Sequence, residues 1–457
     1  MFKKVLVANR GEIAVRIIRS LKEMGIKTVA IYSVADQHSL HVQLADEAVC
    51  VGGNRPQDSY LNMKNILAAA VGTGAEAIHP GFGFLSENSE FVEMCEACGI
   101  TFIGPHSETI ELMGNKANAR VRMQQSAVPV IPGSEGFIAD ADEALKVAAK
   151  VGYPVMLKAA AGGGGKGIRR VDHEEDLVAA FNNAQREAQS AFGDGRMYLE
   201  KIMTNVKHIE VQVFRDRAGH MAYFPERDCS VQRNKQKMIE ESPCSQLTAA
   251  ERAHLGEIAL RATEAIDYLN TGTIEFLMDQ EHHFYFMEMN TRIQVEHTIS
   301  EMITGIDLVK AQIIVAAGVD LPFTQNDVRI SGHAIECRIN AEDPQRDFMP
   351  AVGKVTKLYL PVGNLGVRID SELYSGATIS PYYDAMIAKV VAWGHDRDEA
   401  IAKMIRLLKE MRVEGVTTNQ QFHLEILKDP VFRAGTFTTD YVETQVLPRW
   451  KEKMGEK

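Results

Sequence analysis

Residues 155–171 of the chain read VMLKAAAGGGGKGIRRV, which is an apolar strand pattern, four consecutive glycines and a second extended segment. Glycine loses more entropy on ordering than any other residue, so this run does not form a core element. Successive glycine N–H groups can instead wrap a polyphosphate. Gly165-Lys166 lacks the following Ser or Thr of a P-loop, and a strand rather than a helix comes next. The pattern predicts a mobile flap that covers phosphates, with Lys158 at its entrance as a phosphate contact; the alternative is a plain flexible hairpin.

Two carboxylates lie on a predicted hairpin further along the chain, whose strands flank a short loop at 279–283. Because residues two apart share a face of a strand, Glu288 is expected to point the same way as Phe286 and Asn290, with Glu275 opposite or diagonal to Glu288. Like charges so placed repel, unless a divalent ion lies between them. Carboxylate and amide oxygens suit Mg²⁺ or Mn²⁺. We therefore expect a metal site that works with a nucleotide; the alternative is that one carboxylate faces solvent.

The segment after the second strand is dense in polar side chains. Arg292, Gln294 and Glu296 alternate, so an extended backbone would align them with Asn290. This arrangement places an anion-binding cation and a possible base beside the carboxylate pair. A solvated edge strand is the alternative.

Two other segments carry weaker signals. His208, Glu210 and Gln212 share one face of a strand pattern, which a half-exposed strand explains equally well. Residues 226–237 are polar and rich in cations, as an ordinary solvated loop would be. Next to a nucleotide, the same cations could steady phosphates.

The N-terminus predicts a β-turn-α-β unit, with a strand at 4–8, a helix at 12–23 and a strand at 28–32. The turn contains one glycine, Gly11, and lacks the G-x-G-x-x-G pattern that brings backbone close to a pyrophosphate. We interpret the unit as scaffold and not as an NAD site. Later patterns predict, in order, a boundary near 130, several strands between 195 and 290, a helical stretch at 300–317, a linker at 318–329, and strands followed by helices from 398.

Composition narrows the function. A length of 457 residues suggests about three domains. A net charge of −11 disfavours nucleic acid as a partner, and no apolar run is long enough to span a membrane. The apolar stretch at the N-terminus stops at Asn9, too early for a signal peptide. The six cysteines are scattered, as in a reduced cytoplasmic protein, and we interpret the C-x-x-C at Cys95 and Cys98 as part of an ordinary helix.

Taken together, these motifs resemble those of the biotin carboxylases, ATP-grasp enzymes such as the biotin carboxylase component of acetyl-CoA carboxylase, over nearly the full chain. The most specific stretch is 288–297, EMNTRIQVEH. The other similar segments are 8–14, 79–88, the four-glycine run, 226–230, 332–342 and 381–384.

The resemblance implies an α/β and α+β multidomain fold. An N-terminal Rossmann-like (pre-ATP-grasp) domain would occupy residues 1–114. A central ATP-grasp domain would occupy 115–329 and include the flap subdomain at about 130–203. A C-terminal α+β domain would occupy 330–457.

The resemblance also assigns site residues. The ATP site would comprise Lys116, Lys158, Gly164, Gly165, Glu200, Lys201, Met203, His208, Gln232, Lys235, Leu277, Glu275 and Glu288. Two Mg²⁺ or Mn²⁺ ions would be held by Glu275, Glu288 and Asn290. Bicarbonate would be held by Lys237, Arg292, Gln294, Val295 and Arg338, and biotin would contact Phe82, Gly83 and Arg338. The catalytic residues would be Lys237, Arg292, Arg338 and the base Glu296.

The implied reaction is the carboxylation of biotin. Glu296 would deprotonate bicarbonate, which attacks the γ-phosphate of ATP to give carboxyphosphate and ADP. Carboxyphosphate would release CO₂, and its phosphate would take the ureido proton of biotin while Arg338 stabilises the enolate. The flap would close over this labile intermediate.

Biotin and the acceptor are expected to arrive on other polypeptides, because the chain contains no Met-Lys-Met-like turn for a biotinyl lysine. The resemblance implies a biotin carboxyl carrier protein and carboxyltransferase subunits as partners, a homodimer, and the first half-reaction of acetyl-CoA carboxylase in fatty acid synthesis. The alternative acceptors are another acyl-CoA or pyruvate.

Three positions depart from the family pattern. Phe82 replaces Tyr, Lys235 replaces His beside the ribose, and Thr298 replaces the Pro that follows Glu296-His297. None removes a catalytic group. Two other hypotheses remain: a different ATP-grasp ligase that forms an acyl phosphate, and a catalytically dead scaffold for partner proteins.

Overall fold

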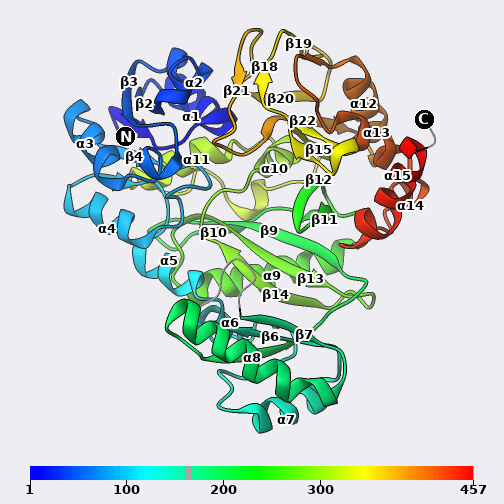
Figure 1. Cartoon of the computed structure of the whole chain (residues 1–457). Coiled ribbons are helices and arrows are strands. Elements are labelled where there is room, and N and C mark those ends of the chain that lie inside the picture. Colours follow the sequence, from blue (N-terminus) through cyan, green and yellow to red (C-terminus); the bar gives the residue numbers. More distant parts are fainter. Residues whose placement is uncertain (160–166, 456–457) are drawn as a thin grey trace.

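The computed structural model describes residues 1–159 and 167–455. The predicted glycine flap, with Gly164 and Gly165, falls largely outside the described residues. Figure 1 shows a central sheet with the N-terminal region at one side, the C-terminal region at the other and a separate lobe below. In the part of the chain that the structure describes, no helix is both long and apolar enough to cross a bilayer.

A five-stranded parallel sheet forms the N-terminal region, in the order β3-β2-β1-β4-β5. Its strands are β1 (Lys4–Val7), β2 (Lys27–Ser33), β3 (Glu47–Gly52), β4 (Ala77–His79) and β5 (Thr101–Phe102). The helices are α1 (Gly11–Glu23), α2 (Leu40–Leu44), α3 (Met63–Thr73), α4 (Ser89–Ala97) and α5 (Ser107–Gly114). Strand β1 is apolar and buried because helices cover both faces of such a sheet. The predicted Rossmann-like start is confirmed.

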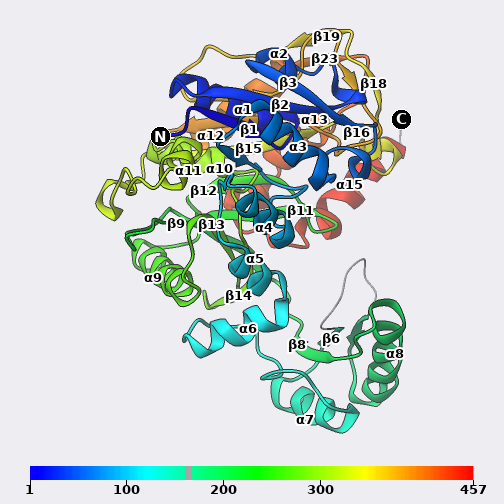
Figure 2. The ribbon, with the colours of Figure 1, turned by 90° about the vertical axis from the view of Figure 1, so that its left-hand side faces the viewer.

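The lobe is a three-stranded antiparallel sheet, β7-β6-β8, covered by two helices. Figure 2 shows it set apart below α5 and α6. Helix α6 (Lys116–Gln125) precedes the lobe, whose elements are α7 (Ala141–Val151), β6 (Val155–Ala159), β7 (Ile168–Val171), α8 (Glu174–Phe192) and β8 (Met197–Lys201). Strands β6 and β7 flank the glycine run and pair with each other, as the strand–glycine–strand pattern predicts.

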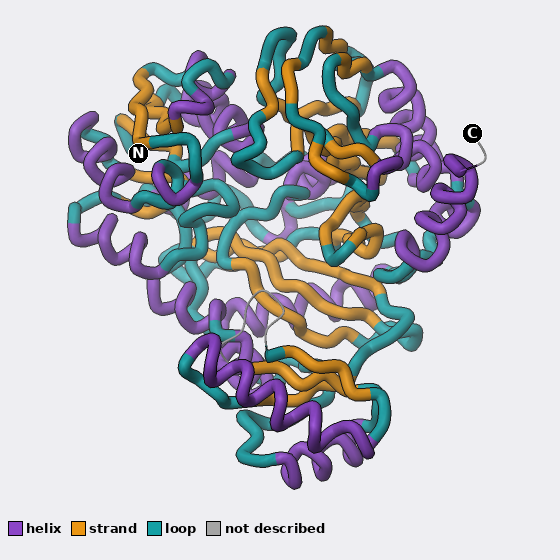
Figure 3. The backbone as a smooth tube through the Cα atoms, viewed as in Figure 1, coloured by secondary structure: helices purple, strands orange, loops and turns teal. Residues whose placement is uncertain are grey.

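The central sheet has nine strands in the order β14-β13-β9-β11-β12-β15-β22-β20, with β10 paired to β9. These are β9 (Lys207–Arg215), β10 (Met221–Tyr223), β11 (Arg227–Arg233), β12 (Gln236–Ser242), β13 (Asn270–Met278), β14 (Phe284–Asn290), β15 (His333–Asn340), β20 (Val367–Ser371) and β22 (Met386–Gly394). The pairing of β12 with β15 makes one sheet from segments on both sides of residues 318–329. Figure 3 shows its strands as a continuous band across the molecule.

The helices around this sheet differ from prediction in two places. Helix α9 (Ala249–Ala265) lies in a region where only strands were predicted, although its capping box, Thr248 with Glu251, is visible in the sequence. The single helical stretch predicted at 300–317 is two helices, α10 (His297–Thr304) and α11 (Leu308–Ala316). Gly305, with a φ of 71°, ends α10 in the left-handed conformation.

The described part of the C-terminal region has four α-helices, of which the first two pack against β15 or β22. They are α12 (Arg397–Glu410), α13 (Gln420–Lys428), α14 (Pro430–Ala434) and α15 (Leu447–Gly455). The region also contains short strands that pair with each other: β16 (Glu342–Asp343) with β17 (Met349–Pro350), β18 (Gly353–Lys354) with β21 (Thr378–Ile379), and β19 (Lys357–Tyr359) with β23 (Arg412–Glu414). The predicted α+β character of this region is confirmed.

The β13–β14 hairpin contains a β-bulge at Met287, because Phe276 pairs with Phe286 whereas Glu275 pairs with Glu288. Without this extra residue Glu275 would oppose Met287, and Glu288 would point to the other face. Phe276 and Phe286 enter the apolar core beneath the sheet, so the carboxylates lie on the opposite face. The predicted opposition of Glu275 and Glu288 is confirmed. The expectation that Phe286 shares the face of Glu288 is wrong, because the bulge reverses the alternation between them.

Candidate active site

Side chains from several strands and one loop converge on Lys237 of β12. Its Nζ lies 2.6 Å from Glu210 Oε2, 2.7 Å from Glu296 Oε1 and 2.9 Å from Glu275 Oε1. Burial would lower the pKa of Lys237, but the three carboxylates outweigh it and raise that pKa well above its ordinary value. Lys237 is therefore a fixed positive charge at the centre of the site.

Glu296 immediately precedes α10 and is fully buried. Its Oε2 accepts a hydrogen bond from Arg338 Nη2 at 2.9 Å, and Arg338 Nε donates to Glu240 Oε1 at 2.6 Å. Burial would raise the pKa of Glu296, but Lys237 and Arg338 lower it well below its usual range. The ionised carboxylate is thus paired with two cations that are also suited to bind a small anion.

Glu275, Glu288 and Asn290 form an oxygen-rich set on one face of the hairpin. Asn290 Nδ2 donates to Glu275 Oε1 at 2.9 Å, and Lys116 Nζ donates to Glu288 Oε2 at 2.5 Å. Opposed carboxylates beside an amide are the hard donors that Mg²⁺ and Mn²⁺ prefer. These residues fit a divalent ion by donor chemistry and by register, and neither carboxylate simply faces solvent.

His208 and Glu210 of β9 stand beside Glu275. One ligand atom from each of the three lies within 4.8 Å of the other two, and His208 Nε2 lies 3.1 Å from Glu275 Oε2. Burial would raise the pKa of Glu275, but Lys237 and His208 lower it below its usual range. Strand β9 is buried over nearly its whole length. The half-exposed strand considered for this segment is therefore wrong, and its polar face turns into the site.

Arg292 forms several side-chain hydrogen bonds in the loop that follows β14. Its Nη2 donates to Asn290 Oδ1 at 3.0 Å, its Nη1 donates to Gln294 Oε1 at 3.1 Å, and its Nε donates to Glu87 Oε2 at 2.8 Å. Strand β14 ends at Asn290, so side-chain hydrogen bonds and not an extended backbone bring these groups together. Gln294 is buried, which excludes the solvated edge strand.

The other residues assigned to ATP come mainly from the three-stranded sheet of the lobe and from the central sheet. Lys158 Nζ of β6 binds Glu200 Oε2 of β8. Lys201 Nζ points away from that pair, to the carbonyls of Gly152 and Tyr153. The remaining members lie at these places: Met203 after β8, His208 on β9, Gln232 on β11, Lys235 in the β11–β12 turn and Leu277 on β13.

The loop after β4 carries Phe82 and Gly83. Asn9 Nδ2 donates to the carbonyl of Phe82 at 2.8 Å, and Lys389 Nζ lies 5.8 Å from the centre of the Phe82 ring. Lys389 also donates to the carbonyl of Val295 at 2.9 Å and lies directly opposite Arg338 in the β15–β22 ladder. Lys389 therefore connects this loop with the residues around Glu296.

Four charged residues of this network were not assigned a role from the sequence: Glu87, Arg227, Glu240 and Lys389. Arg227 is fully buried and its Nε donates to Glu210 Oε1 at 2.6 Å. Glu210 was noted only as a weak signal, through its alternation with His208 and Gln212. Residues 226–237, interpreted as a solvated loop in one alternative, are mostly a buried hairpin.

Two of the departures from the family pattern have clear structural settings. Asn234 and Lys235 have φ angles of 49° and 64° and form the two-residue turn between β11 and β12. Positive φ at both positions is typical of a type I′ hairpin turn. Thr298, fully buried in the first turn of α10, donates from Oγ1 to Glu336 Oε2.

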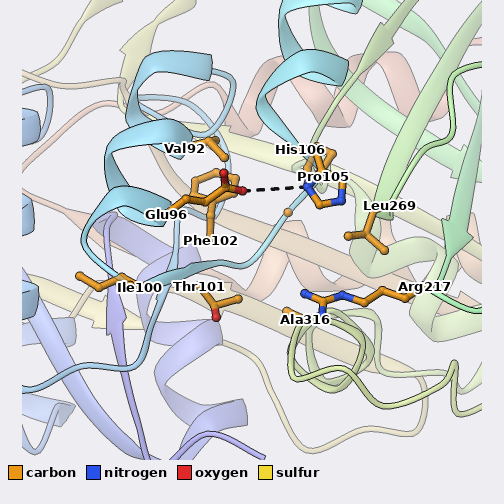
Figure 4. Close-up of a pocket in the computed structure, with 12 residues that line it drawn as sticks. Val92, Glu96, Ile100, Thr101, Phe102, Pro105, His106, Arg217, Leu269 and Ala316 are labelled. Carbon is orange, nitrogen blue, oxygen red and sulfur yellow. Dashed lines mark ion pairs between the residues drawn. The ribbon is translucent and has the colours of Figure 1, made fainter.

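A separate cavity of about 250 Å³ lies between the N-terminal region and the central sheet. Figure 4 shows Glu96 and His106, 4.0 Å apart, on one side and the guanidinium of Arg217 on the other. Its lining is mixed, with the apolar side chains of Phe102 and Leu269 beside these charged and polar groups. It lacks the opposed carboxylates and the lysine-centred network, so we place the chemistry at Lys237.

Three sequence families match the chain. Residues 1–110 match "Biotin carboxylase, N-terminal domain", residues 115–324 match "Carbamoyl-phosphate synthase L chain, ATP binding domain", and residues 336–444 match "Biotin carboxylase C-terminal domain". "Biotin carboxylase 1" of Bacillus subtilis (strain 168) is 52% identical over 445 residues, 97% of this chain and 99% of that protein. "Biotin carboxylase" of Pseudomonas aeruginosa is 48% identical over 447 residues, 98% of this chain and 99% of that protein.

Solved structures are equally similar. The biotin carboxylase–β,γ-ATP complex from Campylobacter jejuni has a TM-score of 0.92 at 49% identity and covers 97% of this chain and 99% of that one. The biotin carboxylase domain dimer of Hydrogenobacter thermophilus 2-oxoglutarate carboxylase, in complex with MgADP, ADP and bicarbonate, has a TM-score of 0.91 at 49% identity and covers 98% and 99%. The multidomain fold implied by the resemblance is thereby confirmed.

Proposed function

The chain belongs to the biotin carboxylase family, and from this membership we infer that it is an ATP-dependent ligase that carboxylates biotin with bicarbonate. The observation that carries the inference is the lysine-centred network, in which Lys237 and Arg338 bracket Glu296 beside the Glu275–Glu288 pair. This network lies in a chain that is about half identical to biotin carboxylases over its length.

We propose that bicarbonate activates its own base. Bicarbonate would enter as an anion and compete with Glu296 for Lys237 and Arg338. As those ion pairs weaken, the pKa of Glu296 rises from its depressed value and the carboxylate becomes basic enough to take the bicarbonate proton. Arg292, Gln294 and the backbone of Val295 would orient the anion for attack on the γ-phosphate of ATP.

The later steps follow from where the charges lie. Attack of the bicarbonate oxygen on phosphorus forms carboxyphosphate and releases ADP. Decomposition of carboxyphosphate gives CO₂ and a phosphate that takes the biotin ureido proton, while the Arg338 guanidinium stabilises the enolate. Divalent ions held by Glu275, Glu288 and Asn290 would neutralise phosphate charge. Lys116, Lys158, His208, Lys235 and the other assigned residues would bind the nucleotide, and Phe82 and Gly83 would contact biotin.

We propose the same three-domain division that the sequence predicts, with boundaries near residues 114 and 329. The family matches at 1–110, 115–324 and 336–444 support it. Biotin would arrive on a separate carrier protein, carboxyltransferase subunits would use the product, and the chain would form a homodimer in the cytoplasm. The dimeric state of the Hydrogenobacter domain supports the homodimer.

The final acceptor is proposed to be acetyl-CoA, as in fatty acid synthesis. A second candidate is a keto acid, because components of a 2-oxoglutarate carboxylase and of a pyruvate carboxylase are each 50% identical to the chain. Both acceptors use the same carboxybiotin, so the site described here does not depend on the choice.

The test is ADP release measured with and without bicarbonate and free biotin. Release should require bicarbonate and rise when biotin is added. ADP release that does not depend on bicarbonate would favour a different ATP-grasp ligase. Failure to bind MgATP would favour a scaffold.

A further inference from the structure

Helix α10 carries the catalytic carboxylate at its start. Glu296 immediately precedes the helix, which lies on one face of β15 and β22. Ile299 and Ile303 of α10 form a small buried cluster with Ala334 of β15 and Val391 of β22. The direction in which Glu296 points is therefore set by how the first turn of α10 sits on two strands from the C-terminal region.

Glu336 is the polar residue under that first turn. It lies between Ala334 and Arg338 on β15, and residues two apart share a face, so all three face α10. Glu336 is fully buried, and Thr298 Oγ1 donates to its Oε2. Its other oxygen, Oε1, has no hydrogen-bond partner within the described residues. The Thr298 hydroxyl thus supports a carboxylate with little other hydrogen bonding.

The Thr298 hydroxyl affects the pKa of Glu336, which lies among several other charged groups. Burial raises the pKa of Glu336 to about 7, while Lys389, Arg338 and the hydrogen bond from Thr298 oppose the rise. Glu240 lies directly opposite on β12, and Glu296 is also close enough to disfavour a second negative charge. The Thr298 hydroxyl is thus one of the groups that favour the ionised form of Glu336.

The residue before Glu296 is also held by a strand of the C-terminal region. Lys389 donates to the carbonyl of Val295 at 2.9 Å, one residue before Glu296, and Thr298 is bound two residues after it. Both attachments come from adjacent strands, β22 and β15. The short segment that contains Glu296 is thus held on both sides of this residue by β15 and β22.

We propose that Thr298 is a positioning residue: its hydrogen bond to Glu336 fixes the first turn of α10 and so aims Glu296 at Lys237 and Arg338. Thr298 acts through Glu336 and touches no substrate. The inference rests on the proposed function, because Glu296 is a base only in that reaction.

The test compares Thr298→Val, which keeps the shape but removes the hydroxyl, with Thr298→Ser, which keeps the hydroxyl. Thr298→Val should lower kcat for bicarbonate-dependent ADP release by about 5- to 20-fold, as loss of one buried hydrogen bond permits, and move the acid limb of the pH profile to higher pH. Thr298→Ser should restore most of the rate. ATP affinity should stay unchanged in both. Thr304→Val, at the other end of α10, is the matched control and should behave like wild type.

Glu336→Gln shows whether Thr298 acts through Glu336. This variant should flatten the acid limb, and adding Thr298→Val to it should cause little further loss, because the two residues form one unit. An unchanged pH profile in Thr298→Val or in Glu336→Gln would overturn the proposal, as would a full additional loss in the double variant. Wild-type release that does not need bicarbonate would instead refute the proposed function, before any variant is compared.

Discussion

Arg338 and Lys389 lie directly opposite each other in the β15–β22 ladder, and the two cations hold neighbouring residues of one loop. Arg338 Nη2 binds Glu296 Oε2 at 2.9 Å, and Lys389 Nζ binds the Val295 carbonyl at 2.9 Å. Glu296, the proposed base, therefore belongs to one segment of the chain and is positioned by another. Mutations in the C-terminal strands should alter chemistry as well as stability.

Arg338 should matter more for biotin carboxylation than for ATP cleavage, because in the proposed mechanism it stabilises an oxyanion formed late. Glu296→Ala should abolish ADP release and carboxybiotin formation together. Arg338→Ala should leave residual uncoupled ADP release, and Arg338→Lys should recover only part of the coupling, since Lys keeps charge but loses the planar two-point geometry. Both products are measured side by side, with exposed Arg346→Lys as the control. Equal loss of both products in Arg338→Ala would place Arg338 wholly in the first half-reaction.

Substitutions at Glu275 and Glu288, the proposed metal ligands, should affect ATP turnover and folding stability differently. Glu288→Gln should strongly weaken Mg²⁺-dependent ATP turnover and change the free energy of unfolding by less than about 1 kcal/mol, because its ion pair with Lys116 is partly exposed. Glu275→Gln should also lose turnover but should destabilise by about 1–3 kcal/mol, because its charged hydrogen bonds are buried.

The metal titration and denaturant unfolding are run on the same samples. Glu281→Gln, exposed in the loop of the same hairpin, is the matched control. An unchanged Mg²⁺ dependence in Glu288→Gln would show that this carboxylate is not a ligand.

Stability should fall as pH rises through neutrality, in part because of Glu240. Burial and the neighbouring carboxylates Glu336 and Glu296 raise the pKa of Glu240 from 4.5 to about 8, although Arg338 opposes the rise. The folded protein then holds a proton that the unfolded chain has lost. This contribution is complete below about pH 4.5 and disappears as pH rises through about 8. Thermal melting at several pH values should show a smaller decline between pH 6 and 8 in Glu240→Gln than in wild type. Parallel curves would contradict the assignment.

Lys235→His should be tolerated. The turn requires positive φ at residue 235, a conformation in which His is enriched among non-glycine residues. Lys235 is exposed, so the melting temperature should not change. Lys can only donate a hydrogen bond to the ribose, whereas neutral His can also accept one, so the KM for ATP should shift only about 2- to 5-fold, the size of one exposed polar contact. Collapse of turnover would show that Lys235 has a different role.

The sequence predicts those parts of the site whose residues are neighbours along the chain. The alternation around Asn290, Arg292 and Gln294 marked a real cluster, although side-chain hydrogen bonds and not a strand assemble it. The opposition of Glu275 and Glu288 was predicted, yet it depends on a bulge at Met287 that no residue type announces.

Contacts between distant segments could not be predicted from local patterns. Glu240 meets Arg338 across 98 positions and Lys389 meets Val295 across 94. Nothing near Glu240 or Lys389 distinguishes them from other charges in buried strands. Only the packed sheet shows which distant groups each one meets, and Lys389 also pairs with Glu12, 377 positions away, at 3.0 Å.

The hydrogen bonds between β12 and β15 also limit how the polypeptide can be divided. A fragment that began at residue 330 would leave one edge of β15 open, and the complementary fragment would leave β12 open. Each edge includes buried apolar residues, Ile239 on β12 and Ile335 on β15, and unpaired strand edges recruit other strands. Neither piece should remain monomeric when expressed by itself, whereas the two produced together should recombine through this seam.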